Sequence, residues 1–339
     1  MVGEVDKKVK VGLVGAGAIA QTYAQVLTKS ASAKLSAVAD VRSEPASALA
    51  EAAGARPFPD HEALAKADVC EVVIVCTPPS SHSQITKTFL ERGLPVMCEK
   101  PLSIDLSSAR EMVELAKERK VILTMASKFR YVDDVIRAKS ILSSGILGDI
   151  VLFENAFASR VDMTSRWNSN QSVSGGGVLI DNGTHSVDIA RYLLGPITQV
   201  QAVEGRRVQA VGVEDTVRLF IRTASDVMGT IDLSWTINKE LDTFVDIYGS
   251  HGVVRVGWKW SRFRQLGGTD WVTFGRGYDK LDAIGRQIDN FCAAVRGEER
   301  LLITADDALA SVGVIEAAYR SLTDDRWVGV TSPKPIAAS

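Results

Sequence analysis

A glycine-rich turn near the N-terminus constrains this chain more than any other feature of its sequence. An apolar run at residues 10–15 leads into the motif GAGAIA at residues 15–20, and a helical pattern follows over residues 18–30. Gly15 permits a tight turn from strand to helix, and Gly17 lets an anionic group approach the backbone. The free N–H groups at a helix amino end favour an anion. The turn therefore predicts a dinucleotide-binding Rossmann unit, with cofactor contacts at Gly15, Gly17, Ala18 and Ile19.

The residue at the end of the second apolar run bears on the choice of cofactor. Asp40 ends the run at residues 35–40. A carboxylate there accepts hydrogen bonds from the adenosine ribose hydroxyls and repels a 2′-phosphate. Arg42 partly offsets this preference, because a guanidinium pairs well with phosphate. The sequence predicts NAD, with NADP as the alternative; the other interpretation of Asp40 is a turn residue that starts a loop.

Short apolar runs alternate with helical patterns up to about Ala126. Continuous apolar runs are typical of parallel strands that are buried on both faces. Their alternation with helices predicts a doubly wound parallel sheet. Strands are predicted at 10–15, 35–40, 72–77, 96–100 and 121–126, with a weaker candidate at 55–60, and helices at 18–30, 43–53, 81–92 and 105–119.

After Ala126 the strand pattern changes to a period of two. Val217, Leu219 and Ile221 alternate with Arg218, Phe220 and Arg222, and sheets with one polar face are usually antiparallel. The fold class predicted is α/β: an N-terminal Rossmann domain (1–126), a C-terminal α+β domain with a large, mostly antiparallel open sheet (127–330), and a loose tail (331–339). The second face of that sheet is either a subunit interface or a solvated face. Strands are predicted at 149–157, 198–208, 216–222, 230–235, 242–249 and 252–257, and helices at 132–144, 177–194, 281–296 and 305–322.

Composition excludes several classes of function. The formal net charge is −2, which gives no electrostatic basis for binding nucleic acid or an anionic membrane. The N-terminal residues lack the apolar core of a secretory signal, and no apolar run approaches the roughly 18–20 residues of a membrane span. The four cysteines form no CxxC pair and the four histidines are scattered. We expect a cytoplasmic protein with buried thiols and no metal site.

Three further segments are predicted at strand ends, where ligands bind in open α/β sheets. They are TPPSSH at residues 77–82, EKP at 99–101, and SGGGVLIDNGTH at 174–185. With the glycine turn, and in this order, they resemble the Gfo/Idh/MocA oxidoreductases, a family named for glucose–fructose oxidoreductase and inositol dehydrogenase. The resemblance covers nearly the whole chain.

The resemblance implies three catalytic residues. Lys100 matches the lysine that lies near the nicotinamide and contacts the reacting oxygen, where a cation stabilises a developing alkoxide. Asp181 and His185, four residues apart on one helix face, match the inositol-dehydrogenase-like branch. His185 is then the general base for alcohol oxidation, and Asp181 orients the substrate or His185. The other interpretations are a surface lysine, a helix N-terminal carboxylate and a structural histidine.

Further site residues follow from the same resemblance. Glu99 faces the cofactor or orients Lys100, and His82 supports the cofactor site or caps its helix. Asp188, three residues beyond His185, is a candidate partner for that histidine. The predicted cofactor-binding residues are Gly15, Gly17, Ala18, Ile19, Asp40, Arg42, Thr77, Pro78, His82, Glu99, Lys100 and Lys128. The predicted substrate-binding residues are Lys100, Lys128, Arg166, Trp167, Asp181, His185 and Tyr278.

One position departs from the family pattern. Lys128 stands where the family has an asparagine, and it adds a positive charge near the nicotinamide or the substrate. This suggests an anionic substrate, such as a sugar nucleotide or a sugar acid.

The resemblance implies an NAD-dependent dehydrogenase. A hydride passes between nicotinamide C4 and a secondary alcohol or ketone of a sugar, cyclic polyol or sugar derivative, while Lys100 and His185 handle the proton. Two alternatives stay open: an NAD-dependent glycoside hydrolase of the same fold, and a non-catalytic NAD-sensing protein. The expected partners are a carbohydrate-type small molecule and further copies of the chain, as a homodimer or homotetramer through the C-terminal sheet. Neither nucleic acid nor a membrane is expected.

Overall fold

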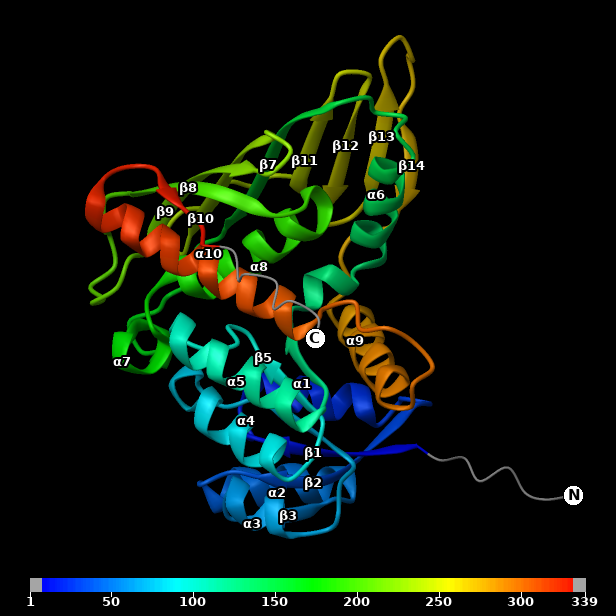
Figure 1. Cartoon of the computed structure of the whole chain (residues 1–339), viewed down its shortest axis with the longest axis vertical. Coiled ribbons are helices and arrows are strands. Elements are labelled where there is room, and N and C mark those ends of the chain that lie inside the picture. The colour runs from blue at the N-terminus through cyan, green and yellow to red at the C-terminus, as the bar shows by residue number, and fades with distance from the viewer. Residues whose placement is uncertain (1–7, 332–339) are drawn as a thin grey trace, which may run out of the picture. The chain divides into compact units, whose positions relative to one another are not determined.

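The chain divides into two compact units. The structure, a computed structural model, describes residues 8–331. Within these, the first unit comprises residues 8–102, 107–128 and 280–305, and the second comprises 103–106, 129–279 and 306–331 (Figure 1). These units differ from the predicted limits chiefly at 280–305, which belong to the first unit. The predicted tail at 331–339 lies, apart from Thr331, outside the described residues.

The first unit is built on a six-stranded sheet in which neighbouring strands all run parallel, in the order β3-β2-β1-β4-β5-β6. This confirms the predicted doubly wound sheet. The strand order reverses direction between β1 and β4, which is the switch point where open α/β sheets bind ligands. The strands are β1 (Val9–Val14), β2 (Ala33–Ala39), β3 (Arg56–Phe58), β4 (Val72–Val75), β5 (Val96–Glu99) and β6 (Leu123–Ala126).

Helix α9 (Lys280–Val295) returns to the first unit from far along the chain. Its Ile284, Ile288 and Phe291 share one buried core with Leu13 of β1 and Tyr23 of α1 (Ala18–Leu27). Burying a large apolar side chain stabilises a fold by about 1.5–3 kcal/mol. The sequence predicted this helix at 281–296 but placed it in the second domain. Helical periodicity shows that one face is buried, and does not show which sheet buries it.

The second unit contains a nine-stranded sheet in the order β14-β13-β12-β11-β7-β10-β9-β8-β15. Its neighbours pair antiparallel except for β10 and β7, which run parallel. The predicted large, mostly antiparallel sheet is therefore confirmed. Its strands are β7 (Ile150–Ala158), β8 (Ile197–Glu204), β9 (Thr216–Thr223), β10 (Met228–Ser234), β11 (Thr243–Gly249), β12 (Gly252–Gly257), β13 (Ser261–Gln265), β14 (Val272–Gly275) and β15 (Val328–Gly329).

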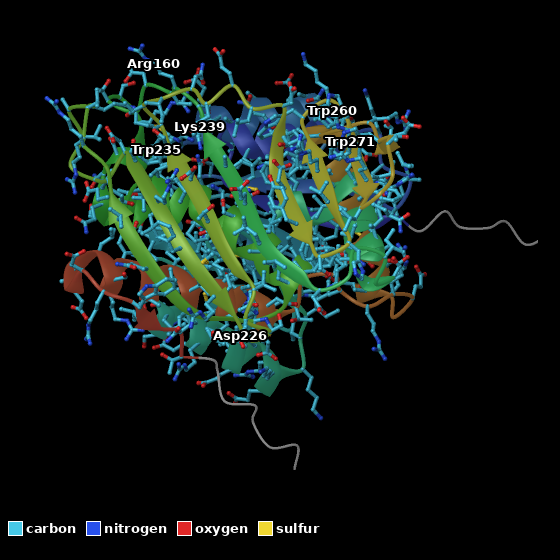
Figure 2. All side chains as sticks on the ribbon, turned by 90° about the horizontal axis from the view of Figure 1, so that it is seen from above. Arg160, Asp226, Trp235, Lys239, Trp260 and Trp271 are labelled. Atoms are coloured by element: carbon cyan, nitrogen blue, oxygen red, sulfur yellow. The ribbon has the colours of Figure 1, made fainter. Side chains whose placement is uncertain are left out.

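Helices cover one face of this sheet. On β9, Val217, Leu219 and Ile221 are buried, whereas Arg218 and Arg222 on the other face are exposed. Helix α8 (Val178–Leu194) packs against β7, β9 and β10 on the buried side. Figure 2 looks onto the opposite, outer face, where the strands lie in front of the helices.

The remaining longer helices of the two units are α2 (Ser43–Ala53), α4 (His82–Glu91), α5 (Leu106–Arg119), α6 (Asp133–Ser143) and α10 (Ala305–Asp324).

Short elements are where the sequence prediction and the structure differ. Helices α3 (His61–Lys66) and α7 (Gln171–Ser174), and strands β13 to β15, were not predicted. None of these segments shows a clear apolar run or hydrophobic period in the sequence. Among residues 8–331, no helix combines the length and the apolar composition that crossing a membrane requires.

Candidate cofactor and active site

The predicted cofactor residues gather at one edge of the six-stranded sheet. Gly15 follows β1, Asp40 follows β2, Thr77 follows β4, and Lys100 follows β5. Lys128 comes shortly after β6. Because the carboxyl ends of parallel strands meet at the same edge, these residues flank the switch point between β1 and β4. The residues that the sequence proposed for the cofactor thus follow strands of one sheet, and their binding roles stay predictions.

The glycine turn has the geometry that a dinucleotide phosphate requires. Gly15 has a φ of 100°, and a Cβ there would lie 2.8 Å from the carbonyl oxygen of Cys76. Gly17 is the N-cap of α1, makes no side-chain cap, and has no heavy atom within 4 Å of a Cβ position. Ala18 and Ile19 form the first helical positions. The amino end of α1 thus offers N–H groups and open space, and these residues fit the cofactor.

Asp40 lies beside that turn and is already engaged by its own neighbours. Its Oδ2 accepts from the Ala16 backbone N–H at 2.8 Å and from Arg42 at 3.2 Å. Its Oδ1 accepts from the backbone and the side chain of Arg42, at 2.8 and 3.2 Å. Burial alone would raise the pKa of Asp40, but these hydrogen bonds hold it below its usual value. An adenosine ribose would share this carboxylate with the exposed guanidinium of Arg42.

His82, the first residue of α4, links two of the strand-end segments. Its Nδ1 lies 2.8 Å from the carbonyl oxygen of Pro101, and its Nε2 lies 2.9 Å from that of Thr77. Burial lowers the pKa of His82. Because backbone oxygens engage both ring nitrogens, the geometry favours a supporting role: His82 joins the TPP segment, including Pro78, to the EKP segment.

The carboxylate of Glu99 lies close to two lysines. Its Oε1 accepts from the Tyr23 hydroxyl at 2.9 Å, and its Oε2 accepts from the backbone N–H of Lys100 at 3.1 Å. Burial raises the pKa of Glu99, and the charges of Lys128 and Lys100 oppose that rise. Sequence reasoning missed Tyr23, because a tyrosine on the buried side of α1 looks like an ordinary core residue.

In the second unit, α8 carries Asp181 and His185, and a glutamate holds its amino end. Oε1 of Glu214 accepts from the backbone N–H groups of Gly177 and Leu179, at 2.9 and 3.1 Å. It also accepts from the Tyr319 hydroxyl at 2.8 Å. A Cβ at Gly176 would collide with the Tyr319 ring system, and one at Gly177 would collide with the Glu214 backbone. The glycine run is therefore required by this close approach.

His185 belongs to an aromatic cluster. The Phe129 ring meets His185 edge to face, with centroids 5.0 Å apart, and stacks on Tyr278 at 4.9 Å. Trp258 meets Tyr278 at 5.8 Å and keeps 37% of its surface exposed. Phe157 and Phe244 complete the cluster. Of the predicted substrate residues, the structure thus brings His185 and Tyr278 together through Phe129.

Asp188 has a different partner from the predicted one. It is fully buried, and its two oxygens accept from Arg130 at 3.1 and 2.5 Å. Arg130 also lies 3.4 Å from Asp307. Breaking such a buried pair by removing one partner typically costs about 3–5 kcal/mol. Asp188 therefore anchors α8 to the segment that carries Phe129 and Arg130.

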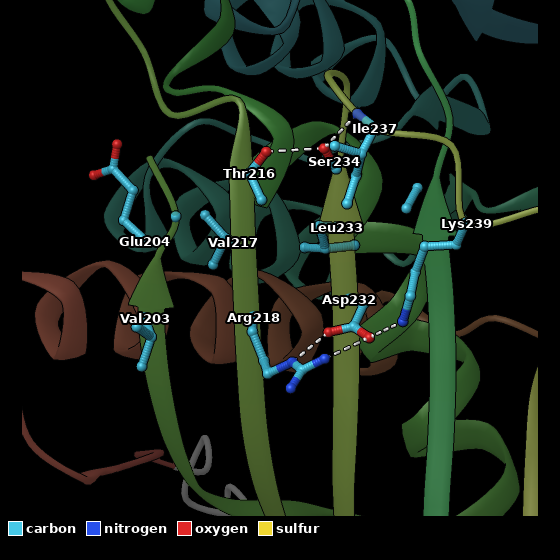
Figure 3. Close-up of a pocket in the computed structure, with 12 residues that line it drawn as sticks. Val203, Glu204, Thr216, Val217, Arg218, Asp232, Leu233, Ser234, Ile237 and Lys239 are labelled. Atoms are coloured by element: carbon cyan, nitrogen blue, oxygen red, sulfur yellow. Dashed lines mark hydrogen bonds and ion pairs between the residues drawn. The ribbon is translucent and has the colours of Figure 1, made fainter. Parts of the chain in front are cut away.

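Two predicted residues and one pocket lie elsewhere in the second unit. Arg166 and Trp167 are exposed, at the start of a 3-10 turn between β7 and α7. A pocket of about 220 Å³ lies on the outer face of β8 to β10 (Figure 3). Its lining contains none of the predicted catalytic or cofactor residues, so it is separate from the chemistry proposed for this chain. No group of three or more potential metal-ligating side chains occurs in the part of the chain that the structure describes.

The sheet edge and the two protein-family matches define the class of protein. A glycine turn at the switch point of a parallel sheet is the arrangement of a dinucleotide-binding fold. Residues 9–127 match the family described as "Oxidoreductase family, NAD-binding Rossmann fold", and residues 135–255 match the GFO/IDH/MocA C-terminal domain. The chain belongs to the Gfo/Idh/MocA family of NAD-binding oxidoreductases.

Individual relatives are similar over different lengths. Inositol 2-dehydrogenase of Rhizobium meliloti is 26% identical over 342 residues, covering 95% of this chain and 99% of that protein. D-glucoside 3-dehydrogenase of Escherichia coli is 34% identical over 209 residues, covering 60% of this chain and 59% of that protein. The crystal structure of GenD2 from gentamicin A biosynthesis, in complex with NAD, superposes with a TM-score of 0.84 at 28% identity, covering 96% of this chain and 97% of that one.

Proposed function

We propose that this protein is an NAD-dependent dehydrogenase that interconverts a secondary alcohol and a ketone on a sugar, cyclic polyol or sugar derivative. The observation that carries the proposal is the sheet order β1-β4-β5, which brings Lys100 to the same edge as the glycine turn. The relatives named for inositol and D-glucosides support the substrate class.

The proposed chemistry divides the work between two side chains. Bound NAD supplies the acceptor for the hydride that leaves the alcohol carbon, at C4 of its nicotinamide. The ammonium of Lys100 stabilises the negative charge that develops on the reacting oxygen. His185 takes the proton that leaves the hydroxyl, and returns it in the reverse direction. Asp181, one turn away on α8, orients the substrate or His185.

The aromatic cluster supports a ring-shaped substrate. Trp258 and Tyr278 offer flat apolar surfaces with polar tips, which suit the C–H face of a sugar or cyclitol. A sugar acid or sugar nucleotide remains the finer alternative because of Lys128. Replacing Lys128 with methionine tests it: if the substrate is anionic, KM for that substrate rises, and unchanged kinetics reject the idea.

The outer face of the large sheet is our proposed surface for a homodimer or homotetramer. Val203 and Ile237 expose apolar surface there, beside a network in which Asp232 pairs with Arg218 and Lys239 (Figure 3). Light scattering of the purified protein tests this assembly. We also propose a cytoplasmic location, which the four free and buried cysteines support.

A screen of NAD reduction over polyols, aldoses, glycosides and sugar acids tests the function. Lys100→Ala and His185→Ala should each lower kcat by roughly 100-fold or more, because an acid–base or electrostatic group is lost, while NAD still binds. Lys87→Ala and His251→Ala are matched controls at surface positions, and they should retain normal turnover. Near-normal turnover in both active-site variants would reject the assigned roles.

A further inference from the structure

A hydrogen-bonded relay joins three distant segments of the first unit. Gln287 Nε2 of α9 donates to the Tyr23 hydroxyl at 2.8 Å, and that hydroxyl donates to Glu99 Oε1 at 2.9 Å. Glu99 Oε2 in turn accepts from the backbone N–H of Lys100 at 3.1 Å. We propose that Tyr23 and Gln287 are positioning residues for Lys100, acting through Glu99. The proposal rests on the role of Lys100 proposed above.

The direction of the relay follows from counting hydrogens. A tyrosine hydroxyl has one hydrogen, and the Glu99 carboxylate can only accept. Tyr23 therefore donates to Glu99, and Gln287 must present its amide nitrogen rather than its oxygen. The amide oxygen of Gln287 is left buried without a hydrogen-bond partner among residues 8–331. Such a buried, unsatisfied oxygen is unfavourable, so the orientation of Gln287 is set by what Glu99 requires.

The charge on Glu99 is the reason that the relay matters. Burial raises the pKa of this carboxyl, and the Tyr23 hydrogen bond acts with the charges of Lys128 and Lys100 to lower it. The relay thus favours a carboxylate beside two lysines, at the end of β5. That carboxylate attracts both ammonium groups and fixes the backbone at Lys100.

The relay lies within the packing of α9 against α1. Tyr23 and Gln287 each have 1% of their surface exposed, so their polar groups sit inside the core that α1 and α9 share. Buried polar groups of this kind specify one arrangement of the helices that carry them. Because the amino end of α1 holds the glycine turn, one hydrogen-bonded chain connects the cofactor helix, α9 and the EKP segment.

The first test is Tyr23→Phe in the full-length protein. The variant leaves the Glu99 carboxylate with one hydrogen bond fewer, so its ionisation requires a higher pH. We expect kcat at neutral pH to fall about 10-fold, and the acidic limb of the kcat profile to move up by about one pH unit. Gln287→Met should also lower kcat, but by only about 3-fold, since Tyr23 can still donate its hydrogen bond to Glu99.

Tyr248→Phe is the matched control. The Tyr248 hydroxyl also pairs with a glutamate, Glu154, at 3.1 Å, but on the sheet of the second unit. This variant should leave kcat and the pH profile of kcat unchanged.

A double-mutant cycle separates positioning from packing. Glu99→Gln removes the charge, and the amide of Gln287 can turn over so that the hydrogen bonds persist in reverse. In this background, Tyr23→Phe should lower kcat by less than about 2-fold further, because its effect passes through the Glu99 charge. Additive losses would show that Tyr23 acts through packing alone, and would overturn the proposal.

A readout without substrate distinguishes this proposal from the role of Lys100. The free energy of unfolding is measured against pH for a protein that has Glu99 and for the same protein with Glu99→Gln. The difference between the two curves reports the titration of Glu99. Tyr23→Phe should move the midpoint of that titration to higher pH. An unmoved midpoint overturns the relay whatever Lys100 does, and a moved midpoint with unchanged kcat overturns its action on Lys100. The role of Lys100 itself fails separately, if Lys100→Ala keeps its turnover.

Discussion

Each unit of this molecule contains a buried glutamate that accepts a hydrogen bond from a tyrosine hydroxyl, Glu99 from Tyr23 and Glu214 from Tyr319, and these two pairs use the same groups differently. Glu99 spreads its hydrogen bonds over both oxygens and lies near two lysines. Glu214 receives two backbone N–H groups and the Tyr319 hydroxyl on a single oxygen. Burial raises the pKa of both carboxyls. The groups around each pair therefore decide what its carboxylate does. We propose that Glu99 acts through its charge, whereas Glu214 holds the amino end of a helix in place.

The largest expected loss of stability tests the structural role of Glu214. Glu214→Ala leaves two backbone N–H groups of α8 and one hydroxyl unpaired in a buried place. We expect the unfolding free energy to fall by about 3 kcal/mol, as measured by urea denaturation. The exposed Glu154, which also pairs with a tyrosine, supplies the control: Glu154→Ala should change stability by at most about 0.5 kcal/mol. Equal losses would break the distinction between a helix cap and a surface pair.

The next prediction tests the proposed role of the negative charge on Glu99. Glu99→Gln removes a carboxylate from beside Lys100 and Lys128, and we expect kcat to fall about 10-fold, which is about 1.4 kcal/mol in the barrier. Glu214→Gln is the matched substitution in the second unit. It should change kcat by less than about 3-fold, because the amide oxygen can keep all three hydrogen bonds. A larger loss in the Glu214 variant than in the Glu99 variant would reverse the comparison. Steady-state kinetics at saturating NAD measures both.

The sequence predicted both sheets. The continuous apolar runs predicted the parallel sheet, and the period-two strands predicted the antiparallel one, because each pattern reports how many faces are buried. Gly15, Asp40 and Lys100 could be found because strand ends and glycine turns are local features. Their location at one edge follows from the parallel sheet alone. The roles assigned to them remain predictions.

The partners that hold these residues could not be predicted in the same way. Tyr23 and Gln287 are 264 positions apart, and Tyr319 and Glu214 are 105 positions apart. No local period records a contact between such distant residues. Asp188 shows the same limit: its spacing pointed to His185, and its partner is Arg130, which is 58 positions away. The glycine run at 175–177 was the one local sign of Glu214. Such a run indicates that another group lies close to the backbone, but it does not show which group that is.

A smaller loss sharpens the contrast between the two tyrosines. Tyr319→Phe leaves Glu214 with two backbone donors, so we expect the unfolding free energy to fall by only about 1 kcal/mol. A loss as large as that of Glu214→Ala would mean that the hydroxyl, and not the helix end, is the main partner. Combining Tyr319→Phe with Glu214→Gln measures the coupling directly, and the two losses should not add.

The last prediction is a gain rather than a loss, and it concerns pH. The folded-state pKa of Glu214 is raised above its ordinary value of 4.5 because the carboxyl is buried. The folded protein therefore binds this proton more tightly than the unfolded chain does. Its contribution to stability is complete below about pH 4.5, and is lost as the pH rises through the folded-state pKa.

Glu214→Gln cannot titrate, and it keeps the hydrogen bonds at the amino end of α8. The variant should therefore gain stability relative to the native protein as the pH rises through that window, and the difference should level off above it. Urea unfolding of both proteins across this pH range measures the change. A difference that stays constant, or that shifts in favour of the native protein as pH rises, would show that the ionised carboxylate itself stabilises the helix end. In that case Glu214 would act through its negative charge, as proposed for Glu99, and the two glutamates would have the same kind of role.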